Sequence, residues 1–194
     1  MAPPKAKEGV LTITPYAGSD VGSGGADRIV ISSNESAFGP SWRAMEAYSA
    51  SSEEMHRYPE IDARSLRQAL ADHHGLEVDR IICGCGSDQL IDLIALAYAG
   101  PGDETVYSEH GFTMYPIATR GVGATPVAAA EANLTADVDA ILGCVNDRTR
   151  IVFLANPNNP TGTYLGIDEL RRLQAGLPED VLLVLDAAYA EYVM

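Results

Sequence analysis

From residue 80 onward, segments typical of β-strands alternate with segments typical of α-helices. Short apolar runs suit buried strands, and the stretches between them space their apolar residues as an amphipathic helix does. Because such an alternation joins parallel strands through helical crossovers, it predicts an α/β fold with a mostly parallel sheet in three αβα layers. The expected strands are 80–83, 104–107, 125–128, 150–155 and 181–185, and the expected helices are 87–99, 111–120, 137–144 and 168–173.

The first part of the chain differs in composition from the rest. Residues 1–39 are rich in Gly, Ser and Pro and contain a short strand-like run at 28–32, which predicts an N-terminal arm. Residues 40–194 are expected to form the folded domain. Two helices should precede the alternation: one at 42–50, and one that Asp62 caps and that Gly75 ends after His74.

Charge and cysteine content exclude several classes of protein. The chain carries 27 acidic and 13 basic residues, which opposes nucleic acid or an anionic membrane as a partner. No apolar run is long enough to cross a bilayer and the N-terminus has no apolar signal segment, so we expect a cytoplasmic protein. Cys83, Cys85 and Cys144 offer too few ligands for a zinc site, so we expect buried, reduced thiols and no metal.

The segment Asn156–Gly162 has the sequence Asn-Pro-Asn-Asn-Pro-Thr-Gly and lies between two strongly apolar expected strands. It directly follows the strand 150–155, and Asp186 directly follows the strand 181–185, with Tyr189 three residues later. An amide, a carboxylate and a phenol are therefore expected beyond the carboxyl ends of two buried strands. Open α/β sheets bind ligands at this edge. The segment therefore predicts a binding site rather than a simple connection.

A second candidate site follows the expected strand 80–83. In Gly84-Cys-Gly-Ser-Asp-Gln89, glycines before Ser87 let the backbone curl at the start of a helix, where N–H groups and the positive helix end suit a phosphate. The alternatives are an ordinary strand-to-helix turn and a dinucleotide site with Glu109 as the ribose-binding acid. The dinucleotide motif requires a third glycine where this chain has Gln89, so it is the weaker choice.

The residues around Asp186 fit a particular chemistry. A carboxylate beside a pyridine nitrogen keeps that nitrogen protonated, and a pyridinium ring accepts electrons from a carbanion, as in pyridoxal phosphate. Asn159 and Tyr189 are candidates to hydrogen-bond the ring's phenolic oxygen, and Phe112 is a candidate to cover its face. For Phe112 alone, a place in the core is the simpler interpretation.

Together these segments resemble the fold-type-I, pyridoxal-phosphate-dependent aminotransferases of class I/II, and within them most closely the histidinol-phosphate aminotransferases. The matching segments occur in the family's order across nearly the whole chain. They are 14–16, 33–40, 57–60, 84–91, 112–115, 156–162 and 186–189. The resemblance implies that residues 40–194 are part of the family's cofactor-binding large domain, without its C-terminal part and without the small domain.

The resemblance also implies a role for each site residue. The cofactor is pyridoxal 5'-phosphate, and its ring would stack on Phe112. Asn159 and Tyr189 would bind the phenolic oxygen, and Asp186 the ring nitrogen. The phosphate would be held by three consecutive residues, Gly86, Ser87 and Asp88.

Two further tyrosines acquire roles only through the resemblance. Tyr58 matches a residue that reaches into the neighbouring subunit's site, which implies a homodimer, and Tyr16 matches a residue near the substrate's phosphate. The implied activity is amino transfer between an amino donor and a keto acid in histidine biosynthesis. Another amino acid transaminase, a cobalamin-pathway decarboxylase that uses the same cofactor, and a non-catalytic cofactor-binding or dimerisation module remain open alternatives.

The family's Schiff-base lysine, which also moves the substrate's proton, follows the segment that matches 186–189. The only lysines of this chain are Lys5 and Lys7, in the N-terminal arm. The resemblance therefore implies an N-terminal part of the enzyme.

We expect these 194 residues alone to have no transaminase activity. Keto acid formation from an amino donor would be measured with added cofactor, and turnover above that of free cofactor would contradict the expectation.

Overall fold

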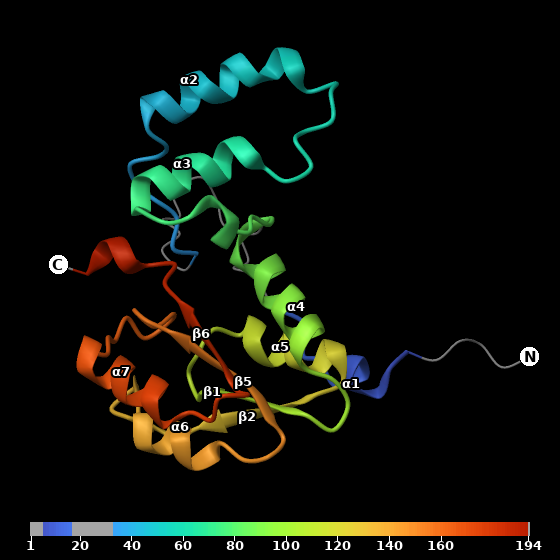
Figure 1. Cartoon of the computed structure of the whole chain (residues 1–194), viewed down its shortest axis with the longest axis vertical. Coiled ribbons are helices and arrows are strands. Elements are labelled where there is room, and N and C mark those ends of the chain that lie inside the picture. The colour runs from blue at the N-terminus through green and yellow to red at the C-terminus, as the bar shows by residue number, and fades with distance from the viewer. Residues whose placement is uncertain (1–5, 17–32, 194) are drawn as a thin grey trace, which may run out of the picture. The chain divides into compact units, whose positions relative to one another are not determined.

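The computed structural model describes residues 6–16 and 33–193, which belong to two compact units (Figure 1). The first unit comprises Met1–Thr14 and Gly84–Met194, and the second comprises Pro15–Cys83. The expected strand at 28–32 lies outside the described residues. The division of the chain into an arm at 1–39 and a domain at 40–194 stays a prediction.

The first unit is built on a four-stranded sheet in the order β2-β1-β5-β6. Its strands are β2 (Thr125–Ala129), β1 (Glu104–Ser108), β5 (Thr149–Ala155) and β6 (Leu182–Asp186). All three strand pairs are parallel, which confirms the predicted parallel α/β sheet. The carboxyl ends of the strands therefore meet at one edge, where β5 and β6 pair up to Ala155 and Asp186.

Helices cover both faces of this sheet, as the alternation predicted (Figure 1). Successive residues of a strand point to opposite faces. In β5, Val152 and Leu154 pack in one core cluster with residues of α6 (Val138–Cys144) and α7 (Ile167–Gly176). Ile151 and Phe153 pack in the other cluster with residues of α4 (Gly86–Tyr98) and α5 (Met114–Val122). The central strand thus supplies side chains to two separate cores.

Several features of the first unit differ from expectation, and one of them is that α7 ends at Gly176, three residues beyond its expected end. Helix α5 begins at Met114, three residues after the expected start, because Gly111 forms a turn in which its N–H donates to the carbonyl of Ser108 at 2.7 Å. An antiparallel hairpin, β3 (Glu131–Ala132) with β4 (Thr135–Ala136), was not predicted. Its strands have two residues each, too few to show a period-two pattern. The short helices α1 (Glu8–Leu11) and η3 (Ala190–Tyr192) also belong to this unit.

The second unit contains α2 (Trp42–Ser51), the 3-10 turn η1 (Ser52–Glu54), α3 (Arg64–His74) and the 3-10 turn η2 (Val78–Arg80). The predicted α2 is confirmed, with Ser41 Oγ accepting from the N–H of Ala44. Gly75 ends α3 with φ 66°, as expected. The predicted cap by Asp62 is wrong: Ala63 is the N-cap residue, and the Glu60 carboxylate accepts from the N–H of Ser65 at 2.9 Å.

The predicted strand at 80–83 is also wrong. Arg80 ends η2, and within the described part of the second unit residues 81–83 pair with no strand. A strand needs a neighbouring backbone to bond, and an apolar run alone does not supply one. Ile82 is consequently 77% exposed.

Of the three free thiols, Cys85 is exposed and the other two are only half-buried, so the expected burial of the cysteines is wrong as well. No helix among the described residues is long and apolar enough to traverse a bilayer.

A buried carboxylate joins the starts of β1 and β5. Glu104 accepts hydrogen bonds from Asn146 Nδ2 at 2.7 Å and from Arg148 Nε at 2.9 Å. The hydrogen bond from Asn146, followed by that from Arg148, holds the pKa of Glu104 below its ordinary value of 4.5. The stability that this group contributes is therefore complete above about pH 4.5 and is lost as the pH falls through the lower pKa of the folded state.

We predict that Glu104→Gln lowers the free energy of unfolding at neutral pH but reduces its loss on acidification, because the variant has no carboxylate to protonate here. Urea unfolding followed by circular dichroism at about pH 7 and about pH 3.5 measures both effects. Glu179→Gln, at an exposed position, is the control. Parallel acid sensitivity of Glu104→Gln and the unchanged chain would contradict the prediction.

Candidate functional site

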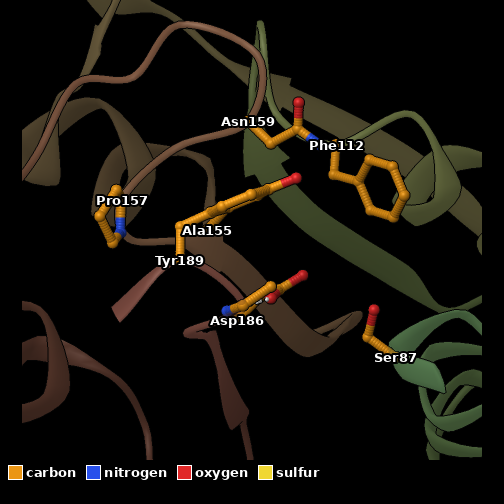
Figure 2. A pocket seen from close by; sticks show the side chains of 8 residues that line it. Ser87, Phe112, Ala155, Pro157, Asn159, Asp186 and Tyr189 are labelled. Atoms are coloured by element: carbon orange, nitrogen blue, oxygen red, sulfur yellow. Dashed lines mark hydrogen bonds between the residues drawn. The ribbon is translucent and has the colours of Figure 1, made fainter. Parts of the chain in front are cut away.

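A pocket in the first unit lies at the carboxyl ends of β5 and β6. Figure 2 shows polar side chains from several elements arranged around it. The lining residues are Ser87, Phe112, Ala155, Pro157, Asn159, Asp186, Ala188 and Tyr189. Parallel strands end together at this edge, so residues that are distant in the sequence converge here. Five of the nine predicted site residues are thus brought together, namely Ser87, Phe112, Asn159, Asp186 and Tyr189.

The first asparagine of the 156–162 loop holds the loop in place. The buried Asn156 side chain donates from Nδ2 to the carbonyl of Leu165 at 3.0 Å, and its Oδ1 accepts from the N–H of Leu165 at 2.7 Å. One side chain therefore pairs with both backbone groups of a buried residue beyond the loop. These backbone groups would otherwise be buried without partners, which is costly.

The second asparagine ties the loop to the segment after β1. Asn158 is buried, and its Nδ2 donates to the carbonyl of His110 at 3.1 Å and to Thr161 Oγ1 at 2.8 Å. The backbone N–H of His110 in turn donates to Glu131 Oε1 at 2.9 Å, which adds the β3–β4 hairpin to the network. Hydrogen bonds therefore join the loop, the segment after β1 and the β3–β4 hairpin.

Asn159, the third asparagine, lines the pocket. It is half-buried, and its side chain makes no hydrogen bond with any other described residue. In Figure 2 its amide lies at the pocket beside Phe112. Of the loop's three asparagines, this one retains its hydrogen-bonding groups for a ligand.

Helix α4 presents its amino end to the same pocket through Ser87. The turn before it is held by Gln89, whose Oε1 accepts from the N–H of Cys85 at 2.6 Å. A Cβ atom at Gly84 would lie 3.0 Å from this Oε1, so a larger residue there would force the Gln89 side chain to shift. The N–H groups of Ser87 and Asp88 in the first helical turn have no helical acceptor, which suits an anion.

Asp186 is held from two sides. Its Oδ2 accepts from the Tyr115 hydroxyl at 2.9 Å, and its Oδ1 accepts from the N–H of Ala188 at 3.1 Å. Tyr115 is 1% exposed, and burial, followed by the nearby Asp186 charge, raises the pKa of its phenol far above the ordinary value. The phenol therefore stays protonated and donates to the carboxylate.

These groups together suit a flat polar ring that carries an anionic substituent. A carboxylate, an amide and a phenol supply hydrogen bonds, Phe112 supplies an apolar wall, and the amino end of α4 supplies donors for an anion.

Comparison with known proteins gives this arrangement a family. The model of the family "Aminotransferase class I and II" matches residues 26–194. The chain belongs to the class I and II aminotransferases.

Relatives within this family are similar along the whole chain. Histidinol-phosphate aminotransferases of Paramagnetospirillum magneticum and Rhodospirillum centenum are 55% and 56% identical over 194 residues. The match covers 100% of this chain but 53% and 54% of theirs, so the chain spans about half the length of these curated relatives.

A solved structure shows the same fold. The crystal structure of histidinol-phosphate aminotransferase from Sinorhizobium meliloti in complex with pyridoxal-5'-phosphate matches with a TM-score of 0.78 at 32% identity. The match covers 81% of this chain and 43% of that one.

Not every predicted site residue of this aminotransferase chain lines the pocket. Gly86 and Asp88 flank Ser87 at the start of α4 without lining it. Tyr16 and Tyr58 are exposed residues of the second unit. The roles of all these residues stay predictions.

Two residues that support the site were missed by the sequence reasoning. Tyr115 closes one of the matching segments, but a contact with a residue 71 positions later leaves no local signal. Gln89 was considered only as a mismatch to a dinucleotide motif, whereas its side chain closes the turn before α4. A carboxamide in the first turn of a helix was an available signal, because such groups often reach back to the preceding backbone.

We predict that Asn156→Ala destabilises the fold and that Asn159→Ala does not. Leaving the backbone groups of Leu165 unpaired should lower the free energy of unfolding by about 3 kcal/mol, since each buried unpaired group costs about 1–3 kcal/mol. Asn159→Ala should cost about 0.5 kcal/mol or less. Urea unfolding of the two variants measures the difference, and equal destabilisation would contradict the division of roles.

Proposed function

We propose that the protein acts in a pyridoxal-phosphate-dependent transaminase of the histidinol-phosphate type. The reaction would move an amino group between histidinol phosphate and a keto acid. The observation that carries the proposal is that one pocket gathers Ser87, Phe112, Asn159, Asp186 and Tyr189. These are residues to which the family resemblance assigns contacts with one cofactor. The similarity to histidinol-phosphate aminotransferases along the whole chain supports the substrate class.

The charge of the pocket fits this cofactor. Asp186 lies among the lining residues, and none of those residues is cationic. Its fixed hydrogen-bond partners, the phenol of Tyr115 and the N–H of Ala188, are neutral. A carboxylate in such a place favours a ligand that brings a positive charge, and a protonated pyridine nitrogen does so. Phe112 supplies the flat apolar surface that a ring requires.

Each residue then has a defined task. Asp186 holds the proton on the ring nitrogen, and Asn159 and Tyr189 donate hydrogen bonds to the phenolic oxygen. Gly86, Ser87 and Asp88 hold the phosphate at the amino end of α4. When bound, the cofactor supplies an electron sink for the substrate's α-carbon. The pocket residues bind and orient the cofactor, and Asp186 keeps its ring nitrogen protonated.

The second unit would complete the assembly. We propose that Tyr58 reaches the site of a second subunit in a homodimer and that Tyr16 lies near the substrate phosphate. Both tyrosines are exposed, so their side chains are accessible to a partner subunit or a ligand. A cytoplasmic location, without nucleic acid or membrane partners, is part of the same proposal.

Genetic complementation tests the substrate and Asp186 together. The complete reading frame that contains this sequence should restore growth without histidine to a bacterium lacking histidinol-phosphate aminotransferase. Asp186→Ala in that frame should abolish growth, because the ring nitrogen loses its carboxylate. Asp168→Ala removes an exposed carboxylate from α7 and should leave growth unchanged.

The outcomes separate the two parts of the proposal. No growth from the unchanged frame would contradict the substrate, which would favour another member of the family's range of reactions. Growth with Asp186→Ala equal to that of the unchanged frame would contradict the role of the carboxylate.

A further inference from the structure

We propose that Tyr115 is a positioning residue that orients the Asp186 carboxylate toward the ring nitrogen of the cofactor. The inference rests on the proposed function, since it concerns the same pocket, and it assigns a task to a residue outside the pocket lining. Tyr115 lies in α5 and Asp186 ends β6, and the hydrogen bond of 2.9 Å is the direct link between them.

The two hydrogen bonds to Asp186 fix the plane of its carboxylate. Oδ1 accepts from the N–H of Ala188 and Oδ2 from the hydroxyl of Tyr115. With one oxygen bonded to each donor, rotation about the Cβ–Cγ bond would break both interactions. Each oxygen keeps a further lone pair, so the carboxylate still accepts a hydrogen bond from a ligand.

The Tyr115 hydroxyl is itself held in a fixed place. Its ring stacks on Phe153 of β5, with centroids 4.9 Å apart and planes 4° apart, and meets the Phe112 ring edge-on at 5.9 Å. The backbone of Tyr115 is tied to Thr119, whose Oγ1 donates to the Tyr115 carbonyl at 2.7 Å. Thr119 Oγ1 also lies 2.7 Å from Thr105 Oγ1 of β1. The position of the hydroxyl is therefore set by the core of the sheet.

The chemistry of the phenol gives this contact one direction. Burial raises the pKa of the Tyr115 phenol, so the phenol stays protonated at neutral and moderately alkaline pH. It donates to Asp186 and the carboxylate accepts. Packing alone needs no hydroxyl here, because phenylalanine would make the same ring contacts. The hydroxyl is thus the part of Tyr115 that acts on the site.

Phe112 links the pocket lining to the Tyr115 ring. Its ring lines the pocket and also contacts the Tyr115 ring. The surface that would cover the cofactor and the donor that holds Asp186 therefore belong to one aromatic cluster, formed by Phe112, Tyr115 and Phe153.

A pair of ligands that differ only at the ring nitrogen isolates the effect. The probes are pyridoxamine phosphate, which has no aldehyde to react with lysine, and its 1-deaza analogue, which has carbon in place of the ring nitrogen. The measured quantity is the dissociation constant of the 1-deaza analogue divided by that of pyridoxamine phosphate, determined on one protein sample. A high ratio means a preference for the ligand with the ring nitrogen. If only part of the protein is folded, the apparent affinities for both ligands fall by the same factor. The ratio is therefore independent of the folded fraction.

The test compares the unchanged chain with Tyr115→Phe, Asp186→Asn and a matched control. Tyr107→Phe removes a hydroxyl from a half-buried tyrosine that packs against the same core cluster and lies outside the pocket lining. Tyr115→Phe should lower the ratio about 10-fold, the effect expected when a hydrogen bond to a charged group is lost. Asp186→Asn should bring the ratio close to that of Tyr115→Phe or below it, and Tyr107→Phe should leave it unchanged.

The failures of the two proposals give different results. No preference of the unchanged chain for pyridoxamine phosphate overturns both the ring-nitrogen contact and the role of Tyr115. A preference that Asp186→Asn abolishes but Tyr115→Phe retains overturns only the inference about Tyr115. Equal weakening of both ligands by Tyr115→Phe, with the ratio unchanged, shows a purely structural role and also overturns it. In the double variant, an effect no larger than that of Asp186→Asn alone supports action through Asp186.

Discussion

Burial of β5 on both faces determines where the rest of the first unit lies. Residues 151–155 are all buried, and alternate side chains enter the two cores that α4 with α5 and α6 with α7 complete. The strand pairs with β1 on one side and β6 on the other, so its backbone is also bonded on both edges. Such a strand can neither shift by one residue nor turn over without exposing a core. Its last residue, Ala155, is consequently a fixed point on the pocket wall.

Polar groups near this fixed point divide into those that build the site and those that face a ligand. Asn156 and Asn158 satisfy backbone groups of Leu165 and His110 on either side of the loop, and Gln89 does the same for the turn before α4. Asn159 and Asp186 remain at the cavity (Figure 2). A rigid rim is the physical requirement for this division, because polar groups hold a ligand tightly only when they need not reorganise. The proposed ligand contacts and the stability of this loop thus depend on neighbouring residues of the same type.

The sequence was sufficient for the parts of the fold that have a regular signal. Strands β5 and β6 are long apolar runs, and the residues just after them were predicted to form a site because parallel strands end together. The strand expected at 80–83 shows the limit of this reasoning, since a strand exists only where another backbone bonds to it. The β3–β4 hairpin was too short to show a period. Tyr115 was missed because its hydroxyl meets Asp186 through tertiary packing, and no spacing in the chain encodes that distance. The three asparagines of the loop are chemically identical, so only the folded backbone distinguishes their tasks.

The position of β6 has a consequence for the local stability of the site. Among the described strands β6 is an edge strand, with Leu185 45% exposed, yet it carries Asp186 into the pocket. Edge strands usually open at a lower free energy than central strands, and their amide hydrogens exchange sooner. A ligand that contacts Asp186 binds only molecules in which this strand is docked, so its binding energy is added to the local stability of β6. Hydrogen exchange in residues 182–186 would thus report site occupancy more sensitively than exchange in β5, which is protected with or without a ligand.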